Sequence, residues 1–338
     1  MEIDFNNFYG SLITILIIIA LGFALGKFKL ISADTNKQLI NLLLVIFMPV
    51  TLFNAFPAEY NEEYSNLFVQ GLLAGIIVMV AMIILAHVIY GWKKFPVKLP
   101  KKSSKKSSKK VASIASDKKS HRILSDEMYA QAQFALVFNN ATFLGYPIIS
   151  TTFGEQGIVP YCGFIIAFNL ALFSYGVWLF ERKLSAKFFL KTITNPNVIA
   201  VLLGLILFLR HIILPTPIAN AVSFVSNITT PLSLICIGFM LSTAVLGSIN
   251  KRIKLIVIAA IQLTVAPLAT FGLTTLFQFP REVIVICTLI QALPTATSLG
   301  LFAEKYGKGH GVSDASGLVI ISTALSIITL PIISLILI

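Results

Sequence analysis

The stretch FALVFNNATFLGYPIISTTFG, residues 134 to 154, is apolar enough to cross a lipid bilayer but does not read as one simple helix. Asn139 and Asn140 place two adjacent amides in its first half, and Gly145, Tyr146 and Pro147 follow. Proline has no amide hydrogen, and its ring clashes with the preceding helical turn. We therefore expect a spanning helix that is interrupted at Gly145 to Pro147.

A second stretch, IVICTLIQALPTATSLGLFAEKY at residues 284 to 306, has the same design. Gln291 precedes Pro294, and the hydroxyls of Thr295, Thr297 and Ser298 follow it. Irregular backbone at membrane depth is tolerated only where protein buries it or water reaches it. Two such interruptions predict broken helices that meet at a cavity.

The composition is that of a membrane protein. Of 338 residues, 57% are hydrophobic and only 12% are charged, and the mean hydropathy is +0.88. About 20 apolar residues span a bilayer. We therefore expect an all-α polytopic protein with ten spanning helices, one in each charge-free window: 5–26, 38–58, 64–92, 128–154, 156–180, 192–209, 212–250, 255–280, 283–303 and 315–338.

The distribution of positive charge predicts the topology. The net charge is +12, and 24 of the 26 Lys and Arg residues fall in alternate loops, leaving Arg210 and Arg281 on the other face. Positively charged loops stay in the cytoplasm, so both termini are expected outside it, in a multi-pass protein of the plasma membrane. This pattern also argues against nucleic acid as a partner.

Residues 93–127 form the most basic loop and include KKSSKKSSKK at Lys101 to Lys110. Such a run cannot bury a core, so it is expected to be disordered. It is either a solvated cytoplasmic tether or a segment attracted to anionic lipid headgroups, in which each Lys contributes about 1 kcal/mol.

The proline positions indicate an internal repeat. Pro49 and Pro231 are 182 positions apart, Pro147 and Pro294 are 147 apart, and the difference of 35 equals the length of the 93–127 loop. The expected halves are residues 1–154 with 156–180, which include that loop, and residues 192–338. Five helices per half make the second half inverted. A chance match among four prolines is the alternative.

Several short motifs together resemble the auxin efflux carrier family, especially its bacterial permeases for malate and malonate. The resemblance covers nearly the whole chain except the Lys-rich loop, and it rests on Gly22 and Gly26, Met48 to Phe53, Asn140 to Pro147, Asn195 to Ala200 with Gly204, Pro231 to Leu241, Pro294 to Ala296, and Ala303 to Gly307.

The resemblance implies a fold related to the sodium-bile acid symporters. Helices 1, 2, 6 and 7 would form a scaffold, helices 3 to 5 and 8 to 10 a moving transport domain, and helices four and nine would cross at the substrate. Plant members carry their long loop between helices five and six. Here the basic loop lies between three and four, so regulation by the plant loop is not transferred.

Half-helices that begin at the two prolines would present free amide hydrogens at Ile148, Ile149, Thr295 and Ala296, which suit an anion. The expected substrate-binding residues are Asn140, Gly145, Tyr146, Pro147, Ile148, Gln291, Pro294, Thr295, Ala296, Thr297 and Ser298. A facing wall is expected from Asn139, Thr51, Asn54, Asn227 and Ser233. The alternative is that the amides only satisfy carbonyl groups that the interruptions release.

These features predict a secondary transporter, a uniporter or exchanger of a small organic anion such as a dicarboxylate or an auxin-like acid. No charged residue lies in the centre of any window, which argues against ion coupling. A sodium- or proton-coupled symporter, an anion channel, and a receptor or scaffold acting through the basic loop are the alternatives. The expected partners are the substrate, the bilayer and a second copy of the chain.

No catalytic motif or phosphate-binding glycine loop is present, and Cys162, Cys236 and Cys287 are isolated in apolar windows. We therefore expect no enzyme activity, no cofactor and no metal site.

Overall fold

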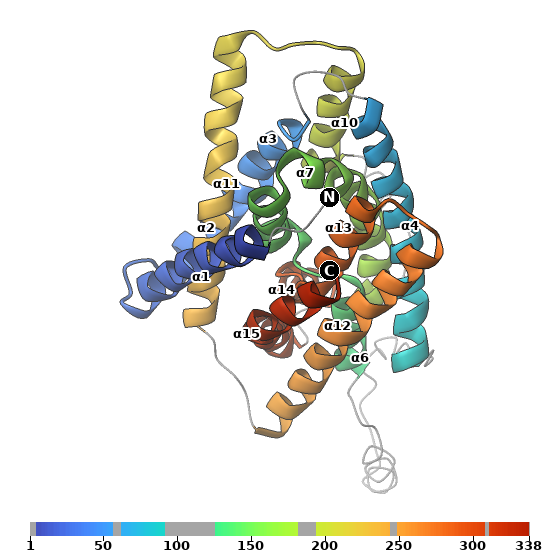
Figure 1. Cartoon of the computed structure of the whole chain (residues 1–338). Coiled ribbons are helices and arrows are strands. Elements are labelled where there is room, and N and C mark those ends of the chain that lie inside the picture. Colours follow the sequence, from blue (N-terminus) through green and yellow to red (C-terminus); the bar gives the residue numbers. More distant parts are fainter. Residues whose placement is uncertain are drawn as a thin grey trace, which may run out of the picture.

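The computed structural model describes residues 5–56, 62–91, 126–181, 194–243, 249–307 and 311–337, and its regular elements are all helical. The expectation of an all-α protein is confirmed for these residues. Most of the predicted basic loop lies outside them, since only its residues 126 and 127 are described. The elements, which Figure 1 shows, are α1 (Phe5–Lys27), α2 (Ala33–Leu42), η1 (Leu43–Phe47), α3 (Met48–Phe53), α4 (Glu62–Tyr90), α6 (Asp126–Val137), η2 (Ala141–Gly145), α7 (Tyr146–Ala171), η3 (Leu172–Gly176), α8 (Val177–Glu181), α10 (Pro196–Leu209), α11 (Thr216–Ser242), α12 (Ile249–Leu276), α13 (Arg281–Ala292), α14 (Ser298–Lys305) and α15 (Val312–Ile336).

The described part of the chain contains seven helices that are long and apolar enough to span a membrane: Tyr9–Lys27, Ala33–Phe53, Glu62–Tyr90, Gln156–Glu181, Thr216–Ser242, Ile253–Leu276 and Val312–Ile336. The predicted window at 192–209 holds the shorter apolar helix α10. The windows at 128–154 and 283–303 hold helices that are interrupted. The protein is therefore a polytopic membrane protein.

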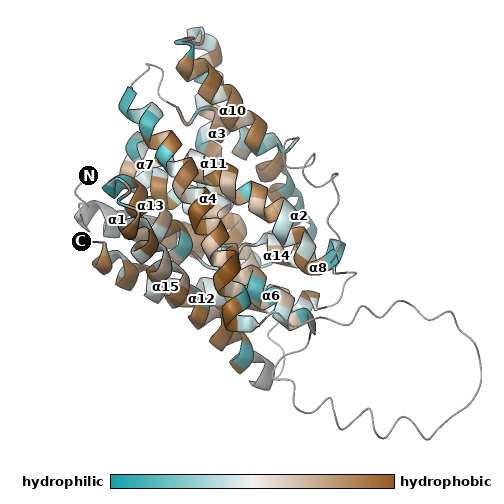
Figure 2. Ribbon diagram, turned by 90° about the vertical axis from the view of Figure 1, so that its right-hand side faces the viewer, coloured by the Kyte–Doolittle hydropathy of each residue, from teal (hydrophilic) through white to brown (hydrophobic). Residues whose placement is uncertain are grey.

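Large apolar side chains cover the outside of the helices. Val88 is 73% exposed, Phe224 is 75% exposed and Ile328 is 64% exposed, although all three lie within candidate spans. In Figure 2 hydrophobic residues predominate along α4, α12 and α15. Buried amides and hydroxyls, such as Gln262 and Thr295, lie inside the helix assembly instead. This arrangement suits lipid as the surrounding solvent.

The helices pack in two groups. In the first group α1 runs along α11, and α3 packs against α10 and α11 (Figure 1). Glycines allow the closest approach: a Cβ at Gly22 would overlap the backbone of Ile235, and one at Gly238 would overlap the carbonyl of Ile19. Small residues at helix contacts are typical of membrane proteins, because backbones can then pack directly on each other.

The second group contains α4, α6, α7, α8 and α12 to α15. Here α4 packs along α7, where a Cβ at Gly71 would overlap Pro160 and one at Gly163 would overlap Phe68. Within α7 the chain turns at Gly154 (φ 54°, ψ −142°), a left-handed conformation that favours glycine. The start of α1 and the end of α15 lie close together (Figures 1 and 2), and Tyr9 and Leu337 belong to one apolar cluster.

Cys162, Cys236 and Cys287 are buried, and each is a free thiol.

Candidate functional site

The two predicted interruptions are present, and they lie inside the second group of helices. The first separates α6, which ends at Val137, from η2, which begins at Ala141. The second separates α13, which ends at Ala292, from α14, which begins at Ser298. Leu293, which follows α13, is extended (φ −69°, ψ 154°). Each helix is therefore divided within one of the apolar windows.

The two interruptions pair with each other through their backbones. The amide of Asn140 donates to the carbonyl of Pro294 (2.6 Å), and the amide of Ala296 donates to the carbonyl of Phe138 (3.0 Å). These bonds flank Asn139 and Thr295, which form an isolated antiparallel bridge. They satisfy polar groups that would otherwise be unpaired at membrane depth. The prediction that the broken helices meet is confirmed.

The position predicted for the first interruption is wrong. The chain leaves the helix at Phe138 to Asn140, whereas Gly145, Tyr146 and Pro147 lie in a continuous run from η2 into α7. The π turn η2 explains why the proline is accommodated. Amides in this π turn donate to carbonyl groups five residues earlier, which widens the helix and makes room for the proline ring. The wider turn also leaves one carbonyl without a helical donor, at the place where proline has no amide hydrogen to give. The same arrangement occurs in η1, which precedes Pro49.

The expected free amide hydrogens are also not found at the predicted positions. Ile148 and Ile149 lie inside the continuous helical run instead of at a helix start. The amide of Thr295 donates to the Ser322 hydroxyl of α15 (3.1 Å), and the amide of Ala296 is used in the bridge. The second half-helix begins at Ser298, with Thr297 as its N-cap, instead of at Pro294.

Three buried amide side chains gather at the bridge. Asn139 donates from Nδ2 to Oε1 of Gln291 (2.9 Å), and Asn140 caps η2 by accepting from the amide of Phe143 (3.3 Å). Asn139 and Asn140 are each 2% exposed, and Gln291 is 1% exposed. Among the described residues, Asn140 Nδ2, Gln291 Nε2 and Asn139 Oδ1 have no hydrogen-bond partner. Buried polar groups of this kind are costly unless a ligand or water completes them.

Two residues that the sequence analysis did not identify hold the second interruption. Gln262 of α12 donates to the carbonyl of Leu293 (2.7 Å) and accepts from the Thr295 hydroxyl (3.2 Å). Ser322 of α15 binds the amide of Thr295. The only sequence signal is a polar residue within a largely apolar helix, and nothing local indicates its partner.

The remaining predicted substrate residues lie on the helical segments that follow the two interruptions. Gly145 faces Leu293, whose side chain would be 2.8 Å from an added Cβ. Tyr146 is buried, stacks edge-on against Tyr161, and lies near Ser226 of α11. Pro147, in the first turn of α7, accepts hydrogen bonds from residues one turn later. Thr297 and Ser298 are half-buried at the start of α14.

The predicted facing wall is only partly assembled. Thr51 of α3 is buried and shares a 2.6 Å hydrogen bond with Thr229 of α11. Ser233 is also buried, and its hydroxyl donates to its own helix, which runs without interruption through Pro231. Asn54 and Asn227 are exposed and do not join this cluster. No local sequence pattern indicates Thr229 as the partner of Thr51.

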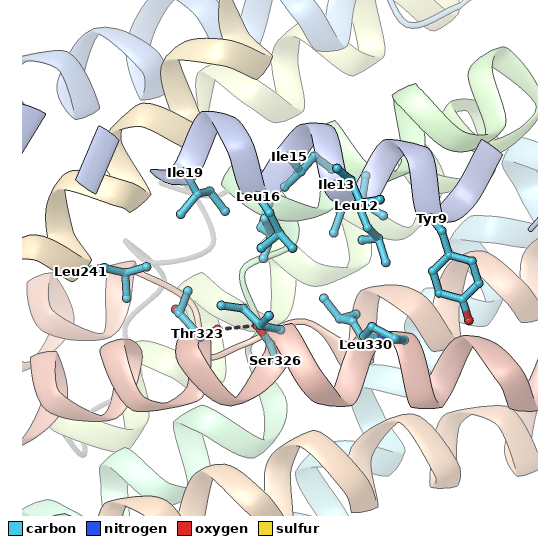
Figure 3. Close-up of a pocket in the computed structure, with 14 residues that line it drawn as sticks. Tyr9, Leu12, Ile13, Ile15, Leu16, Ile19, Leu241, Thr323, Ser326 and Leu330 are labelled. Carbon is cyan, nitrogen blue, oxygen red and sulfur yellow. Dashed lines mark hydrogen bonds between the residues drawn. The ribbon is translucent and has the colours of Figure 1, made fainter. Parts of the chain in front are cut away.

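An apolar hollow of about 170 Å³ lies between α1 and α15 (Figure 3). Figure 3 shows Leu12, Leu16 and Ile19 of α1 above Thr323, Ser326 and Leu330 of α15. Of the predicted site residues, only Ile148 lines this hollow, next to Leu144. The Thr323 and Ser326 hydroxyls both donate within α15, so the lining offers few groups for a polar ligand. The full lining is Tyr9, Leu12, Ile13, Ile15, Leu16, Ile19, Leu144, Ile148, Leu241, Thr323, Ser326, Ile327, Leu330 and Pro331.

Comparison with known proteins places this architecture in a family. A family model described as "Membrane transport protein" matches residues 7–104 and 98–334, which is most of the chain. The chain belongs to the membrane transport protein family. This is the auxin efflux carrier family that the sequence motifs resemble.

The chain is also similar to an uncharacterized transporter of Methanothermobacter thermautotrophicus, with 26% identity over 206 residues. That match covers 60% of this chain and 66% of the relative, so it spans slightly less than two thirds of the relative's length.

Proposed function

We propose that the protein is a secondary transporter of a small organic anion, acting as a uniporter or exchanger in the plasma membrane. The observation that carries this proposal is the pairing of the two interruptions beside unpaired amide donors. Asn140 Nδ2 and Gln291 Nε2 are both buried and lack partners among the described residues. A carboxylate only accepts hydrogen bonds, so it is the ligand chemistry that suits such donors. Exchanging the two ends of the Asn139 and Gln291 amides would still leave one donor and one acceptor unpaired.

The hollow favours one kind of organic anion. Its lining is apolar apart from the Tyr9 phenol and two hydroxyls, and none of the described Lys, Arg or His residues contributes to it. A second carboxylate placed there would be desolvated without a partner, at a cost of several kcal/mol. We therefore favour a monocarboxylic weak acid with an apolar body over a dicarboxylate such as malate. Its carboxylate would lie at the bridge and its body beside Leu144 and Ile148.

The proposed architecture is ten spanning helices in an inverted 5+5 repeat, with both termini outside the cytoplasm. In this proposal the first packing group, with α1, α2, α3, α10 and α11, is the scaffold, and the second group is the transport domain. The grouping of helix contacts supports this division. The closeness of the start of α1 to the end of α15 supports an even number of crossings. Movement of one group along the other would expose the crossing to each side in turn.

The proposal favours transport without ion coupling, because none of the ten apolar windows has an acidic residue in its centre. A sodium or proton symporter is the alternative and would show uptake that depends on the corresponding gradient. A channel of the same architecture would show single-channel currents above the rate of a carrier. The contribution of the basic loop to lipid binding and the formation of a homodimer remain proposals.

Uptake into proteoliposomes tests the proposed function. Purified protein should give saturable uptake of labelled benzoate, a monocarboxylate with an apolar body, and weaker uptake of labelled malate. Asn140→Ala should strongly reduce both by raising the KM. Preferred uptake of malate would contradict the substrate class, and normal uptake by Asn140→Ala would remove the proposed site.

A further inference from the structure

Gln262 contacts the chain on both sides of Pro294. It is 1% exposed on α12, near the middle of a largely apolar candidate span. Its Nε2 donates to the carbonyl of Leu293 at 2.7 Å, and its Oε1 accepts from the Thr295 hydroxyl at 3.2 Å. One side chain therefore uses both its donor and its acceptor on the residues that flank the proline.

The interruption needs this support because the helix cannot supply it. In an unbroken helix the carbonyl of Leu293 would accept from an amide one turn later. The extended Leu293 backbone and the later start of α14 remove that partner. Gln262 replaces it, and Ser322 pairs the amide of Thr295 in the same way. The Ser322 hydroxyl in turn donates to the carbonyl of Val319, so α15 is fixed as well.

The first interruption is held differently, because the Tyr161 hydroxyl of α7 donates to the carbonyl of Ala141 (2.9 Å) and Asn139 binds Gln291 of α13. Asn140 caps its own half-helix, and its Nδ2 has no partner among the described residues. Gln291, one turn before Pro294, likewise has an unpaired Nε2. The carbonyl of Leu293 and the amide of Thr295 are thus paired with Gln262 and Ser322. Asn140 Nδ2 and Gln291 Nε2 are unpaired among the described residues and can bind a ligand. The second interruption is held from α12 and α15, and the unpaired amides of Asn140 and Gln291 belong to the two segments that meet there.

We propose that Gln262 is a positioning residue that fixes the second interruption so that the amides of Gln291 and Asn140 face the substrate carboxylate. This inference rests on the proposed transport of a weak acid. Gln262 acts through Leu293 and Thr295 and does not itself touch the substrate. Its loss should therefore weaken substrate binding without removing any group that binds the substrate.

The test compares two buried glutamines of the same group. Gln262→Met keeps the length of the side chain but removes both hydrogen bonds. Gln131→Met is the matched control, because Gln131 is also 1% exposed and its Nε2 donates to a carbonyl of another segment, at Gly311 (2.9 Å). Both variants should lower the thermal stability to a similar degree. Only Gln262→Met should raise the KM for labelled benzoate, by about tenfold, with a smaller change in kcat.

An unchanged KM in Gln262→Met, or an equal rise in both variants, would overturn the proposal. If Gln262→Met does not fold, Gln262→Glu decides, because a buried neutral carboxyl both accepts and donates. A KM of Gln262→Glu within about threefold of the native value would support the positioning role of Gln262, and a rise of about tenfold would contradict it.

A second measurement does not depend on transport. Hydrogen exchange in the peptide that contains Thr295 should become faster in Gln262→Met and stay native in Gln131→Met. If the native protein transports no weak acid, the proposed function fails. The hydrogen-exchange measurement still tests whether Gln262 holds the second interruption. Unchanged exchange in Gln262→Met would show that Gln262 does not hold the interruption.

Discussion

Asn140 has two roles in the structure that a pair of substitutions can separate. Its Oδ1 accepts a hydrogen bond from the amide of Phe143 and so caps η2, while its Nδ2 is unpaired and is proposed to bind the substrate. Asn140→Ser keeps a hydroxyl that can act as the cap but removes the amide donor. Asn140→Ala removes both groups. A property that differs between the two variants therefore depends on the helix cap. A property that both variants lose depends on the amide donor.

The expected magnitudes follow from the two bonds. Loss of an N-cap side chain costs about 1 kcal/mol, and serine caps nearly as well as asparagine. A hydrogen bond to a charged group contributes about 1.5 to 3 kcal/mol. At about 1.4 kcal/mol per tenfold, removal of the donor should weaken substrate binding roughly 10- to 150-fold. Asn140→Ser should thus lose affinity at nearly native stability, and Asn140→Ala should lose stability as well.

Proteoliposome uptake over a range of benzoate concentrations gives the KM, and thermal unfolding of the purified variants gives their relative stability. The two variants should share a raised KM, with the lower unfolding temperature found only in Asn140→Ala. A native KM in Asn140→Ser would refute the role of the amide donor. Equal destabilisation of both variants would refute the separation of the two roles.

Four further outcomes are expected. Gly238→Ala places a methyl against the carbonyl of Ile19 and should lower the unfolding temperature by separating α1 from α11. Gly272→Ala is the control, because its Cβ would meet nothing within 4 Å, and it should stabilise the folded protein by about 0.5 to 1 kcal/mol in the same assay. Ser326→Leu fills the hollow between α1 and α15 and should reduce benzoate uptake at near-native stability, and undiminished uptake would separate the hollow from transport. Deletion of Lys101 to Lys110 should leave uptake unchanged, whereas loss of function would favour a receptor or scaffold acting through the loop.

The sequence predicted that two helices are broken and meet, but it placed the first break too late. Pro147 is the strongest local breaker, yet η2 accommodates it, and the chain leaves the helix before Asn140. The signal for the true position was available, because an asparagine immediately before an apolar run is a common N-cap. The π turn could not be predicted. No local pattern in Ala141 to Gly145 shows whether an amide donates to the carbonyl five residues earlier or four residues earlier.

The contacts that complete the site could not be predicted from local patterns. The hydrogen bonds of Gln262 to Leu293 and of Ser322 to Thr295 join residues on separate helices. A polar residue in a largely apolar span indicates that a hydrogen-bond partner exists, but it does not identify that partner. The grouping of α1 with α11 depends likewise on Gly22 and Gly238, whose spacing along the chain does not show that they face each other.

The pairing of Asn139 with Thr295 is the centre of this account, and a disulfide tests it most directly. The two residues form a non-hydrogen-bonded antiparallel pair, for which the Cα atoms are typically about 4.5 Å apart, within the range for a disulfide. With Cys162, Cys236 and Cys287 replaced, Asn139→Cys with Thr295→Cys should cross-link on mild oxidation in membranes, as peptide mass spectrometry would show. Helices that pass each other unbroken would leave both thiols free, and that result would contradict the paired interruptions and the site built on them.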